Sequence, residues 1–391
     1  MSVNSLQIED VYQILNSIHS QATGQTSLAP TNTYEFTSMA TTTLAAGVDT
    51  VYNALMNTLG RTVFSVRPYE RKFAGLVQDS VQWGGIKRKI SYADKPIGAE
   101  QAYHPVDGTS VDPWKINKSN VLEMRYYGSA VYQDTVTIFK DQLMQSFESP
   151  AQLGSFVSGQ MTHMSNKWEQ YLENLNRATL ANFIGAKIAA NNGVVHLLTE
   201  YNTQTGQTAN PLTATDIWLP ANMPHFFRWL RARVNTIGRR MAERSGEYQV
   251  QVTGKEIMRH TPFADQKIYL LADVLDQIDT MVNTVTFHDE PLAYADVEGV
   301  SFWQDINTPD SINVTPAVIN AAGVVSQGTA VNQAAIFGVM FDRDALGTNV
   351  KLYDVANSPY NQIGRYWNTT LTANLQYTND LTEKGVILLL D

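Results

Sequence analysis

The residue types that most often perform chemistry form no recognised pattern in this sequence. Its seven histidines are scattered and show none of the spacings that bind zinc. Gly254-Lys255 has the ending of a phosphate-binding loop, but Gln249 stands where the first glycine of that loop is required. The chain has no cysteine, which excludes disulfides, thiolate metal sites and a thiol nucleophile. We therefore predict no catalytic residue, no metal site and no cofactor, and a protein that is not an enzyme.

Two clusters of polar residues are better explained as parts of the framework than as sites. His288, Asp289 and Glu290 are adjacent in the chain, and adjacent side chains rarely converge on one ion. Glu169 and Glu173 lie one turn apart on a predicted helix. An acid–base pair would need burial in a cleft, so we expect these two glutamates to form a solvent-exposed stripe.

The charge balance limits the possible partners. The 28 Lys and Arg residues against 37 Asp and Glu residues give a formal net charge of −9, which argues against a protein that coats nucleic acid with a positive surface. One predicted helix, which begins near Pro224, is nevertheless rich in arginine. We expect these side chains to lie on an interface or to face acidic neighbours: Arg228, Arg231, Arg233, Arg239, Arg240 and Arg244.

The composition indicates a folded protein with a substantial core. Hydrophobic residues make up 43% of the 391 residues and charged residues only 17%, which excludes general disorder. The length allows two or three folding units. The N-terminus has no signal-peptide pattern, and no apolar run approaches the ~20 residues that a membrane span needs. We expect a soluble, cytoplasmic protein.

Helical periodicity begins near the N-terminus. Apolar residues recur at helical spacing over residues 8–18 and again over 44–59, where Gly60 is well placed to end the second helix. Residues 20–38 lie between them, are rich in Thr, Ser and Gln, and predict a linker. A helix tethered by a long polar linker is expected to dock on another surface rather than to belong to a compact core.

Two strand regions flank a long loop. Residues 81–92 and 121–139 are predicted strands, and residues 94–120 contain several glycines and prolines without periodicity. A loop of this length is uncommon inside a compact domain, so we interpret it as a β-arm that projects and is ordered by a neighbour. The candidate contacts between subunits are the basic run and two tryptophans of this arm: Lys87, Arg88, Lys89, Trp83 and Trp114.

One predicted helix is unusually long. Ser149-Pro150 is a strong helix start, and apolar residues then step by three or four as far as Ile188. About 40 residues at 1.5 Å each make a rod of roughly 60 Å. Further helices are predicted at residues 224–241 and 271–282, and strands at 248–253, 267–271, 336–341, 365–377 and 386–390.

The order of these elements resembles the Hong Kong 97-type major capsid protein of tailed bacteriophages, with a layout closest to the coat proteins of small podophages. In sequence, the resemblance rests on Leu59-Gly60-Arg61 leading into the arm and on the closing segments FDRDA at 341–345 and LLLD at 388–391. It implies an α+β fold with five parts. These are an N-terminal arm (1–60), an extended β-hairpin or E-loop with its strands (61–140), a peripheral domain with a spine helix (141–195), an axial domain (196–345) and returning peripheral strands (346–391).

The resemblance also implies a structural function. The chain would assemble with itself into pentamers and hexamers of an icosahedral head, which would enclose double-stranded DNA without sequence-specific binding. Scaffolding, portal and decoration proteins would be further partners, and assembly would take place in the host bacterial cytoplasm without a membrane. Two alternatives stay open: an encapsulin-like shell protein, and a phage adhesin or polysaccharide-active protein. The last of these would carry a pair of carboxylates in a groove.

Overall fold

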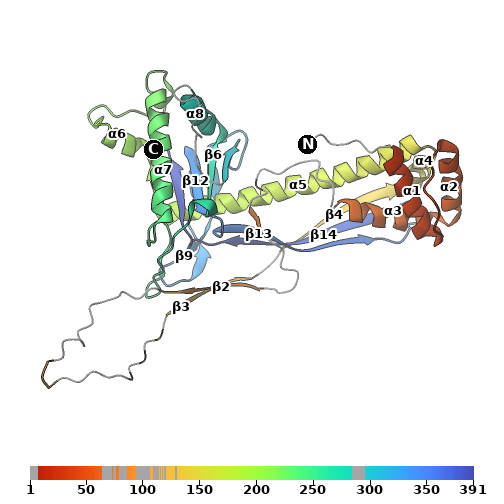
Figure 1. The fold of residues 1–391 in the computed structure, drawn as a ribbon, viewed down its shortest axis with the longest axis horizontal. Coiled ribbons are helices and arrows are strands. Elements are labelled where there is room, and N and C mark those ends of the chain that lie inside the picture. The colour runs from red at the N-terminus through yellow and green to blue at the C-terminus, as the bar shows by residue number, and fades with distance from the viewer. Residues whose placement is uncertain are drawn as a thin grey trace. The chain divides into compact units, whose positions relative to one another are not determined.

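The computed structural model describes residues 8–63, 86–93, 120–127, 130–283 and 296–391, together with short pieces at 73, 76–78, 106–108, 114, 116 and 118. The chain divides into two compact units, and each is assembled from three separate segments (Figure 1). Unit 1 comprises Met1–Trp83, Ser129–Leu175 and Asn349–Gln376. Unit 2 comprises Gly84–Gly128, Asn176–Thr348 and Tyr377–Asp391. The finer division into five parts stays a prediction.

A four-stranded sheet with the order β1-β13-β14-β4 forms the β-part of unit 1. Strands β4 and β14 pair antiparallel from Tyr366↔Phe139 to Leu375↔Ala130. Buried positions alternate along most of β14 with partly exposed ones, as expected for a strand with one face on a core. The bounds of the four strands are β1 Val77–Gln78, β4 Ala130–Phe139, β13 Leu346–Asn357 and β14 Tyr366–Asn379.

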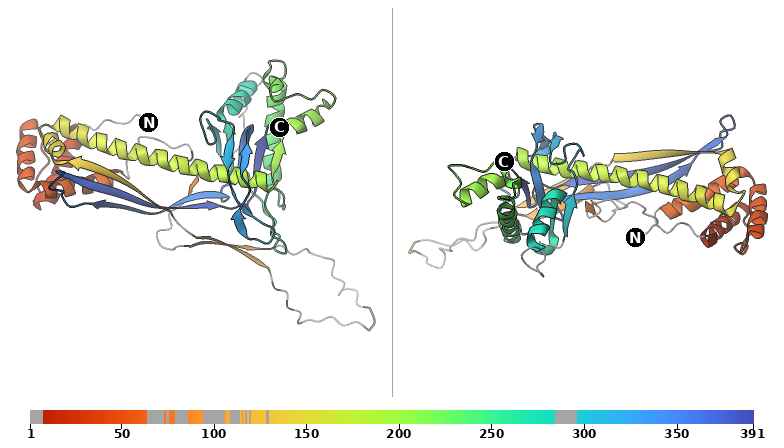
Figure 2. Two further views of the ribbon diagram at one scale, coloured as in Figure 1. Left: turned by 180° about the vertical axis from the view of Figure 1, so that it is seen from behind. Right: turned by 90° about the horizontal axis from the view of Figure 1, so that it is seen from above.

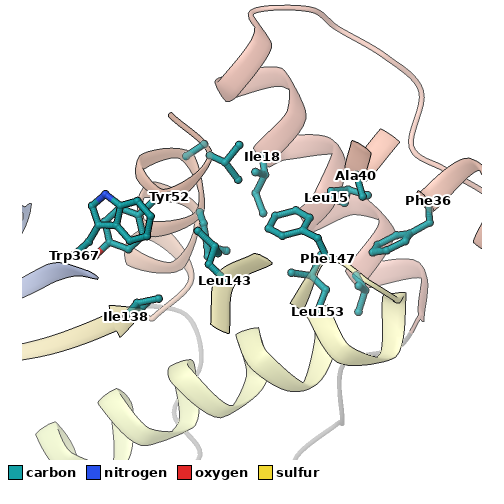
Figure 3. Close-up of a cluster of buried hydrophobic side chains, with 14 residues drawn as sticks. Leu15, Ile18, Phe36, Ala40, Tyr52, Ile138, Leu143, Phe147, Leu153 and Trp367 are labelled. Atoms are coloured by element: carbon teal, nitrogen blue, oxygen red, sulfur yellow. The ribbon is translucent and has the colours of Figure 1, made fainter. Parts of the chain in front are cut away.

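Three N-terminal helices belong to the core of unit 1, so the expected docking on another surface was wrong. They are α1 (Ile8–Thr23), α2 (Thr33–Ala45) and α3 (Val48–Val63). Figure 3 shows that their apolar side chains meet those of α4 (Lys140–Ser146) and of the start of α5 (Pro150–Ala189). The buried side chains labelled there are Leu15, Ile18, Phe36, Ala40, Tyr52, Ile138, Leu143, Phe147, Leu153 and Trp367.

Helix α2 occupies part of the segment that we predicted to be a linker. Asn32 caps it, because its side-chain oxygen accepts a hydrogen bond of 2.9 Å from the backbone N–H of Glu35. Glu35 reaches back to the backbone N–H of Thr31 at 2.8 Å. Gly47, with φ at 107°, then separates α2 from α3 in a conformation that favours glycine. Gly60 does not end α3, which continues to Val63.

The long helix α5 is confirmed. It runs unbroken over the 40 residues of Pro150–Ala189, and the Ser149 hydroxyl oxygen accepts a hydrogen bond of 3.3 Å from the backbone N–H of Gln152 at its start. Its residues as far as Leu175 belong to unit 1 and those from Asn176 belong to unit 2. The same helix thus gives side chains to both units.

A five-stranded sheet with the order β5-β15-β12-β6-β7 lies at the centre of unit 2. Its middle strand β12 is buried along its whole length and pairs antiparallel with both β15 and β6. The edge strands β5 and β7 pair parallel with β15 and β6. The bounds are β5 Val194–His196, β6 Gln266–Leu271, β7 Asp296–Val300, β12 Ile336–Asp342 and β15 Gly385–Leu389.

Helices and short ribbons complete unit 2. Helices α7 and α8 lie side by side next to the sheet (Figure 2).

Residues 248–253, a predicted strand, are irregular instead. The region 121–139 is two strands that belong to different units, because β3 is part of unit 2 and β4 of unit 1. The remaining bounds are α6 Leu197–Gln204, α7 Met223–Ala242, α8 Ala272–Asn283, β2 Ile86–Tyr92, β3 Val121–Tyr127, β8 Ile312–Val314, β9 Ala317–Ile319, β10 Val325–Gln327 and β11 Val331–Gln333.

Trp367 joins the N-terminal helices to the sheet of unit 1. Its ring stacks on Tyr52 with 4.5 Å between the ring centroids, and its indole N–H donates to Asp49 at 2.7 Å. The hydroxyl of Tyr52 lies 2.5 Å from that of Thr369. Trp367 itself is 1% exposed, so its removal would leave a large cavity and an unpaired aspartate.

We expect Trp367→Ala to lower the free energy of unfolding by about 3–5 kcal/mol, the usual cost of truncating a buried tryptophan. Limited proteolysis should then cut the N-terminal helices first, because this ring holds them on the sheet. Tyr34→Ala removes an aromatic ring that is 85% exposed and serves as the control, with a change within about 0.5 kcal/mol. Equal denaturation midpoints for the two variants would contradict the assignment of Trp367 as an anchor.

Candidate functional site

The base of the β2–β3 hairpin carries most of the candidate residues. Its two strands pair antiparallel from Ile86↔Tyr127 to Tyr92↔Val121. Side chains alternate between the two faces of a strand, so Arg88 and Lys89 point in opposite directions. Arg88 and Lys89, although adjacent in the basic run, therefore have different surroundings.

Arg88 lies on the exposed side of the hairpin. Its guanidinium contacts Glu123 of the neighbouring strand at 2.6 Å, and Arg125 contacts the same carboxylate at 2.8 Å. Hydrogen bonds from Arg125 and Arg88 lower the pKa of Glu123 to about 2. The carboxylate thus remains ionised over the whole physiological range, and the pair of arginines leaves a net positive charge on this face.

Lys89 lies on the opposite side and reaches into the interior of unit 2. Its ammonium group forms ion pairs with Asp380, at 2.8 Å, and with Glu383. The two carboxylates belong to the turn between β14 and β15 and are 2% and 8% exposed. Arg259 joins the group through a contact of 2.6 Å with Glu383. We call these four residues, Lys89, Arg259, Asp380 and Glu383, the ion cluster.

The ion cluster is electrically balanced, with two cations and two anions. Burial alone would raise the pKa of Asp380, but the charge of Lys89 and its hydrogen bond hold this pKa below its ordinary value. Burial dominates at Glu383 and raises its pKa in spite of Lys89 and Arg259. Burial works against the charged form of Lys89, yet Asp380 and Glu383 raise its pKa overall. Because each buried charge has a partner, the group is tolerated in the interior.

Further hydrogen bonds fix the hairpin on the body of unit 2. Arg259 donates to the hydroxyl oxygen of Ser91 on β2 at 3.2 Å and to that of Thr382 at 3.3 Å. Asn120, just before β3, donates to the backbone carbonyl of Gly254 at 3.1 Å. The ion cluster and these bonds together fix the base of the hairpin on the rest of unit 2.

Two buried lysines hold the irregular segment that follows α7. The Lys187 ammonium donates to the backbone carbonyl of Tyr248 at 2.7 Å and to Asn192 at 3.2 Å. Burial lowers the pKa of Lys187 to about 7, and the more distant Asp380 and Glu383 oppose this only in part. Lys384 donates to the carbonyl of Glu243 at 2.6 Å and to the Ser245 hydroxyl oxygen at 3.0 Å. Burial lowers the pKa of Lys384 as well.

The structure separates the residues that the sequence grouped together. Trp83 and the side chain of Lys87 lie outside the described residues. Trp114 is 86% exposed, and Arg88 is exposed as well. Lys89 has its ionic partners within its own chain. Contact of these residues with another subunit stays a prediction.

Sequence reasoning missed Asp380, Glu383 and Arg259 as partners of Lys89. The available signal was the charged segment 379–384 (NDLTEK), which sits between two apolar strand patterns. The expected solvent-exposed stripe was also wrong, because Glu169 and Glu173 are 9% and 5% exposed.

A pocket of about 400 Å³ lies between β4 and α5 in unit 1. Its lining combines aromatic rings with an ion pair between Lys167 and Asp134. A polysaccharide-cleaving site needs two carboxylates that flank the bond to be broken. The lining has one, Asp134, and Lys167 neutralises it, so the pocket does not fit that chemistry. The lining residues are Tyr132, Gln133, Asp134, Lys167, Trp168, Gln170, Tyr171 and Asn174.

Among the described residues, no group of three His, Asp or Glu side chains is arranged to hold a metal ion. The sequence candidate at His288, Asp289 and Glu290 lies outside the described residues. No helix in the described part of the chain combines the length and the hydropathy that a membrane crossing needs.

We expect Lys89→Met to lower the free energy of unfolding of unit 2 by about 3–5 kcal/mol, because it leaves two buried carboxylates without their main partner. Arg88→Met is the matched control on the same strand, and it should cost at most about 1 kcal/mol because its ion pair is exposed. Urea denaturation measures both. If the two variants lose the same stability, the ion cluster is not the anchor of the hairpin.

Lys187 should make stability depend on pH near neutrality. Between about pH 7 and its ordinary pKa of 10.5, the unfolded chain binds more protons at this lysine than the folded chain does. The contribution of Lys187 should therefore make stability rise with pH from 7 to about 9.5, by at most about 1.4 kcal/mol per pH unit. Lys384 acts in the same direction, so Lys187→Met should reduce the slope without abolishing it. If the stability of the wild type stays constant or falls with rising pH in this window, burial does not lower the pKa of Lys187 as described.

Comparison with known proteins identifies the family of this chain. The family described as Phi29-like phage major capsid protein matches residues 14–388. No curated protein matches the chain. A chain in the capsid structure of Staphylococcus phage Andhra is similar over 82% of this chain and 84% of its own length, with a TM-score of 0.53 and 11% identity. A chain in the structure of the head fiber and inner core protein gp22 of native bacteriophage P68 is similar over 82% and 85%, with a TM-score of 0.52 and 12% identity.

These matches confirm the α+β fold of the Hong Kong 97 type, which phage capsids carry. They also decide between the readings that the sequence left open, since the matched family is a structural coat protein of a phage head rather than an adhesin or an encapsulin. A coat protein assembles with copies of itself into a shell and is part of the virion. The chain belongs to the Phi29-like phage major capsid protein family.

Proposed function

We propose that this coat protein forms pentamers and hexamers that close an icosahedral head around double-stranded DNA. Assembly takes place in the host bacterial cytoplasm, with scaffolding, portal and decoration proteins as further partners. The role is structural, with no catalytic step by the chain. The five-part division of the chain remains part of this proposal.

Exposed apolar side chains on the segment between β2 and β3 carry the proposal. Val106, Trp114 and Ile116 are 71%, 86% and 81% exposed. Leaving a tryptophan of this size in water is unfavourable, because its burial is worth several kcal/mol. The hairpin that carries them is held firmly at its base by the ion cluster. A neighbouring subunit is the surface that covers them in a shell.

The charge of the chain supports a container for DNA rather than a DNA-binding protein. A net charge of −9 repels the phosphate backbone and keeps the packaged molecule free of strong contacts. The exposed Arg88 and Arg125 lie on the hairpin, where acidic residues of an adjacent subunit are suitable partners. Such exposed pairs contribute at most about 1 kcal/mol each, but the shell repeats them at every contact.

Electron microscopy of the purified chain tests the proposal. The wild type should form rings, sheets or closed shells as its concentration rises. Trp114→Ala should lower the particle yield several-fold without changing the thermal midpoint of the monomer, because the ring lies outside the folded core. Trp114→Phe keeps most of the apolar area and should retain most of the yield. A wild type that stays monomeric up to millimolar concentration contradicts the proposal, as does an unchanged yield for Trp114→Ala.

A further inference from the structure

Helix α7 presents exposed arginines for which the described part of the chain supplies no carboxylate partner, Arg228 and Arg239. Its sequence contains no acidic residue over Met223–Ala242. Arg233 is neutralised by Glu200 through two contacts of 2.6 and 2.8 Å. Arg228, Arg239 and Arg240 are exposed, and within the described part of the chain they form no ion pair. Arg228 and Arg239 lie eleven positions apart, which is close to three full turns and puts them on one face. We call these two residues the arginine stripe.

Helix α8 has the opposite character. It carries Asp273, Asp276 and Asp279 and no Lys or Arg over Ala272–Asn283. Val274 and Ile278 are buried, whereas Asp273 and Asp276 are exposed on the other side of the helix. No cation of the described residues pairs with these aspartates. We call Asp273 and Asp276 the aspartate stripe.

The two stripes lie on neighbouring elements of one unit but do not neutralise each other. Helices α7 and α8 pack side by side (Figure 2), yet their exposed charges form no ion pair across the helix contact. The buried residues of both helices, such as Leu230 and Val274, use the inner faces. Unit 2 therefore exposes one basic and one acidic surface to solvent, and neither stripe forms an ion pair with another described residue of the chain.

A closed ring of identical subunits needs such a pair of surfaces. In a ring of five or six, each subunit contacts its neighbour head to tail, so two different and complementary surfaces meet at every contact. We propose that the arginine stripe of one subunit binds the aspartate stripe of the next subunit around the ring. The inference rests on the proposed formation of pentamers and hexamers and adds the surfaces that select the neighbour.

DNA is the competing occupant of the arginine stripe, because exposed arginines also bind phosphate. Two observations favour a second copy. The aspartates of the adjacent helix would repel a polyanion laid along α7, and the net charge of −9 acts in the same sense. DNA binding would also leave the aspartate stripe without a role.

Charge reversal tests the pairing. Arg228→Glu with Arg239→Glu, or Asp273→Lys with Asp276→Lys, sets like charges against each other at every contact. Each double variant should raise the protein concentration needed for ring formation by about tenfold or more, which corresponds to about 1.4 kcal/mol per contact. The chain with all four changes restores opposite charges at each contact and should recover assembly. Lys255→Glu reverses an exposed charge elsewhere in unit 2 and should leave assembly unchanged.

A mixture of the two double variants gives a sharper readout. Attraction then exists only between unlike chains, so a ring must alternate them. Six positions can alternate, whereas five leave one contact between identical chains. The mixture should therefore form hexameric rings and flat or tubular sheets but few pentamers or closed shells, as counted in electron micrographs. Pentamers and hexamers in wild-type proportion would overturn the pairing.

Two controls separate a loss of the ionic contact from a loss of folding: the folded state of each variant and the salt dependence of its assembly. Circular dichroism and the thermal midpoint check that each variant folds. Should a reversal prevent folding, the milder Arg228→Gln with Arg239→Gln should still weaken assembly and reduce its dependence on salt, because screening acts on the stripes. Shells of normal yield from both reversals overturn this inference alone, while a wild type that never assembles overturns the proposed function with it. Normal shells with reduced DNA retention after the α7 reversal alone assign the stripe to DNA instead.

Discussion

The hairpin of unit 2 keeps its place because Lys89 forms ion pairs with two carboxylates that are buried in the interior. Asp380 and Glu383 are almost fully buried, and they lie about 290 residues further along the chain than their lysine. The two short strands alone would not hold this position, since an isolated two-stranded ribbon is marginal in water. The ion cluster supplies directional contacts that hold the base of the hairpin on the rest of unit 2.

Charge in the interior has a cost, and the chain places it where backbone geometry must be fixed. Lys187 and Lys384 donate hydrogen bonds to the backbone carbonyls of Tyr248 and Glu243, respectively, in a stretch that makes no strand ladder. Tyr248 has a φ of 65°, which a residue with a side chain rarely adopts. An apolar residue in place of Lys187 would pack without a desolvation penalty, but it could not donate a hydrogen bond to the Tyr248 carbonyl. The buried lysines therefore cost some folding free energy, and in return their hydrogen bonds fix the backbone conformation of this segment.

The sequence was most informative where periodicity is long and apolar. The helices α5, α7 and α8 and the strands β6, β12, β14 and β15 follow their hydrophobic patterns closely, and the order of elements was sufficient to suggest the fold. Helix α2 escaped because its Thr-rich sequence hides three inward-facing positions, Phe36, Ala40 and Thr43. The break between β3 and β4 also escaped, because two adjacent strands with similar composition read as one.

The candidate site was harder to predict than the fold. The run Lys87-Arg88-Lys89 marks a charged strand, but the alternation that sends Arg88 to solvent and Lys89 inward has meaning only when the buried face is known. The partners of Lys89 come from a turn near the C-terminus, and no local pattern reports a pairing over that distance. Charge of one sign on α7 was visible in the sequence, whereas its neighbour α8 became relevant only through the packing of unit 2.

The contact between Tyr52 and Trp367 has a consequence for how a new copy of this protein is made. The two rings are separated by more than 300 residues, as the 317-residue spacing from Tyr52 to Thr369 shows. Synthesis proceeds from the N-terminus at about 5–20 residues per second, so the N-terminal helices leave the ribosome tens of seconds before the strand that completes their core. Until then, the apolar faces of these helices cannot pack against Trp367. A chain released early cannot finish unit 1, and the last stretch of translation decides whether a copy is fit to enter a shell.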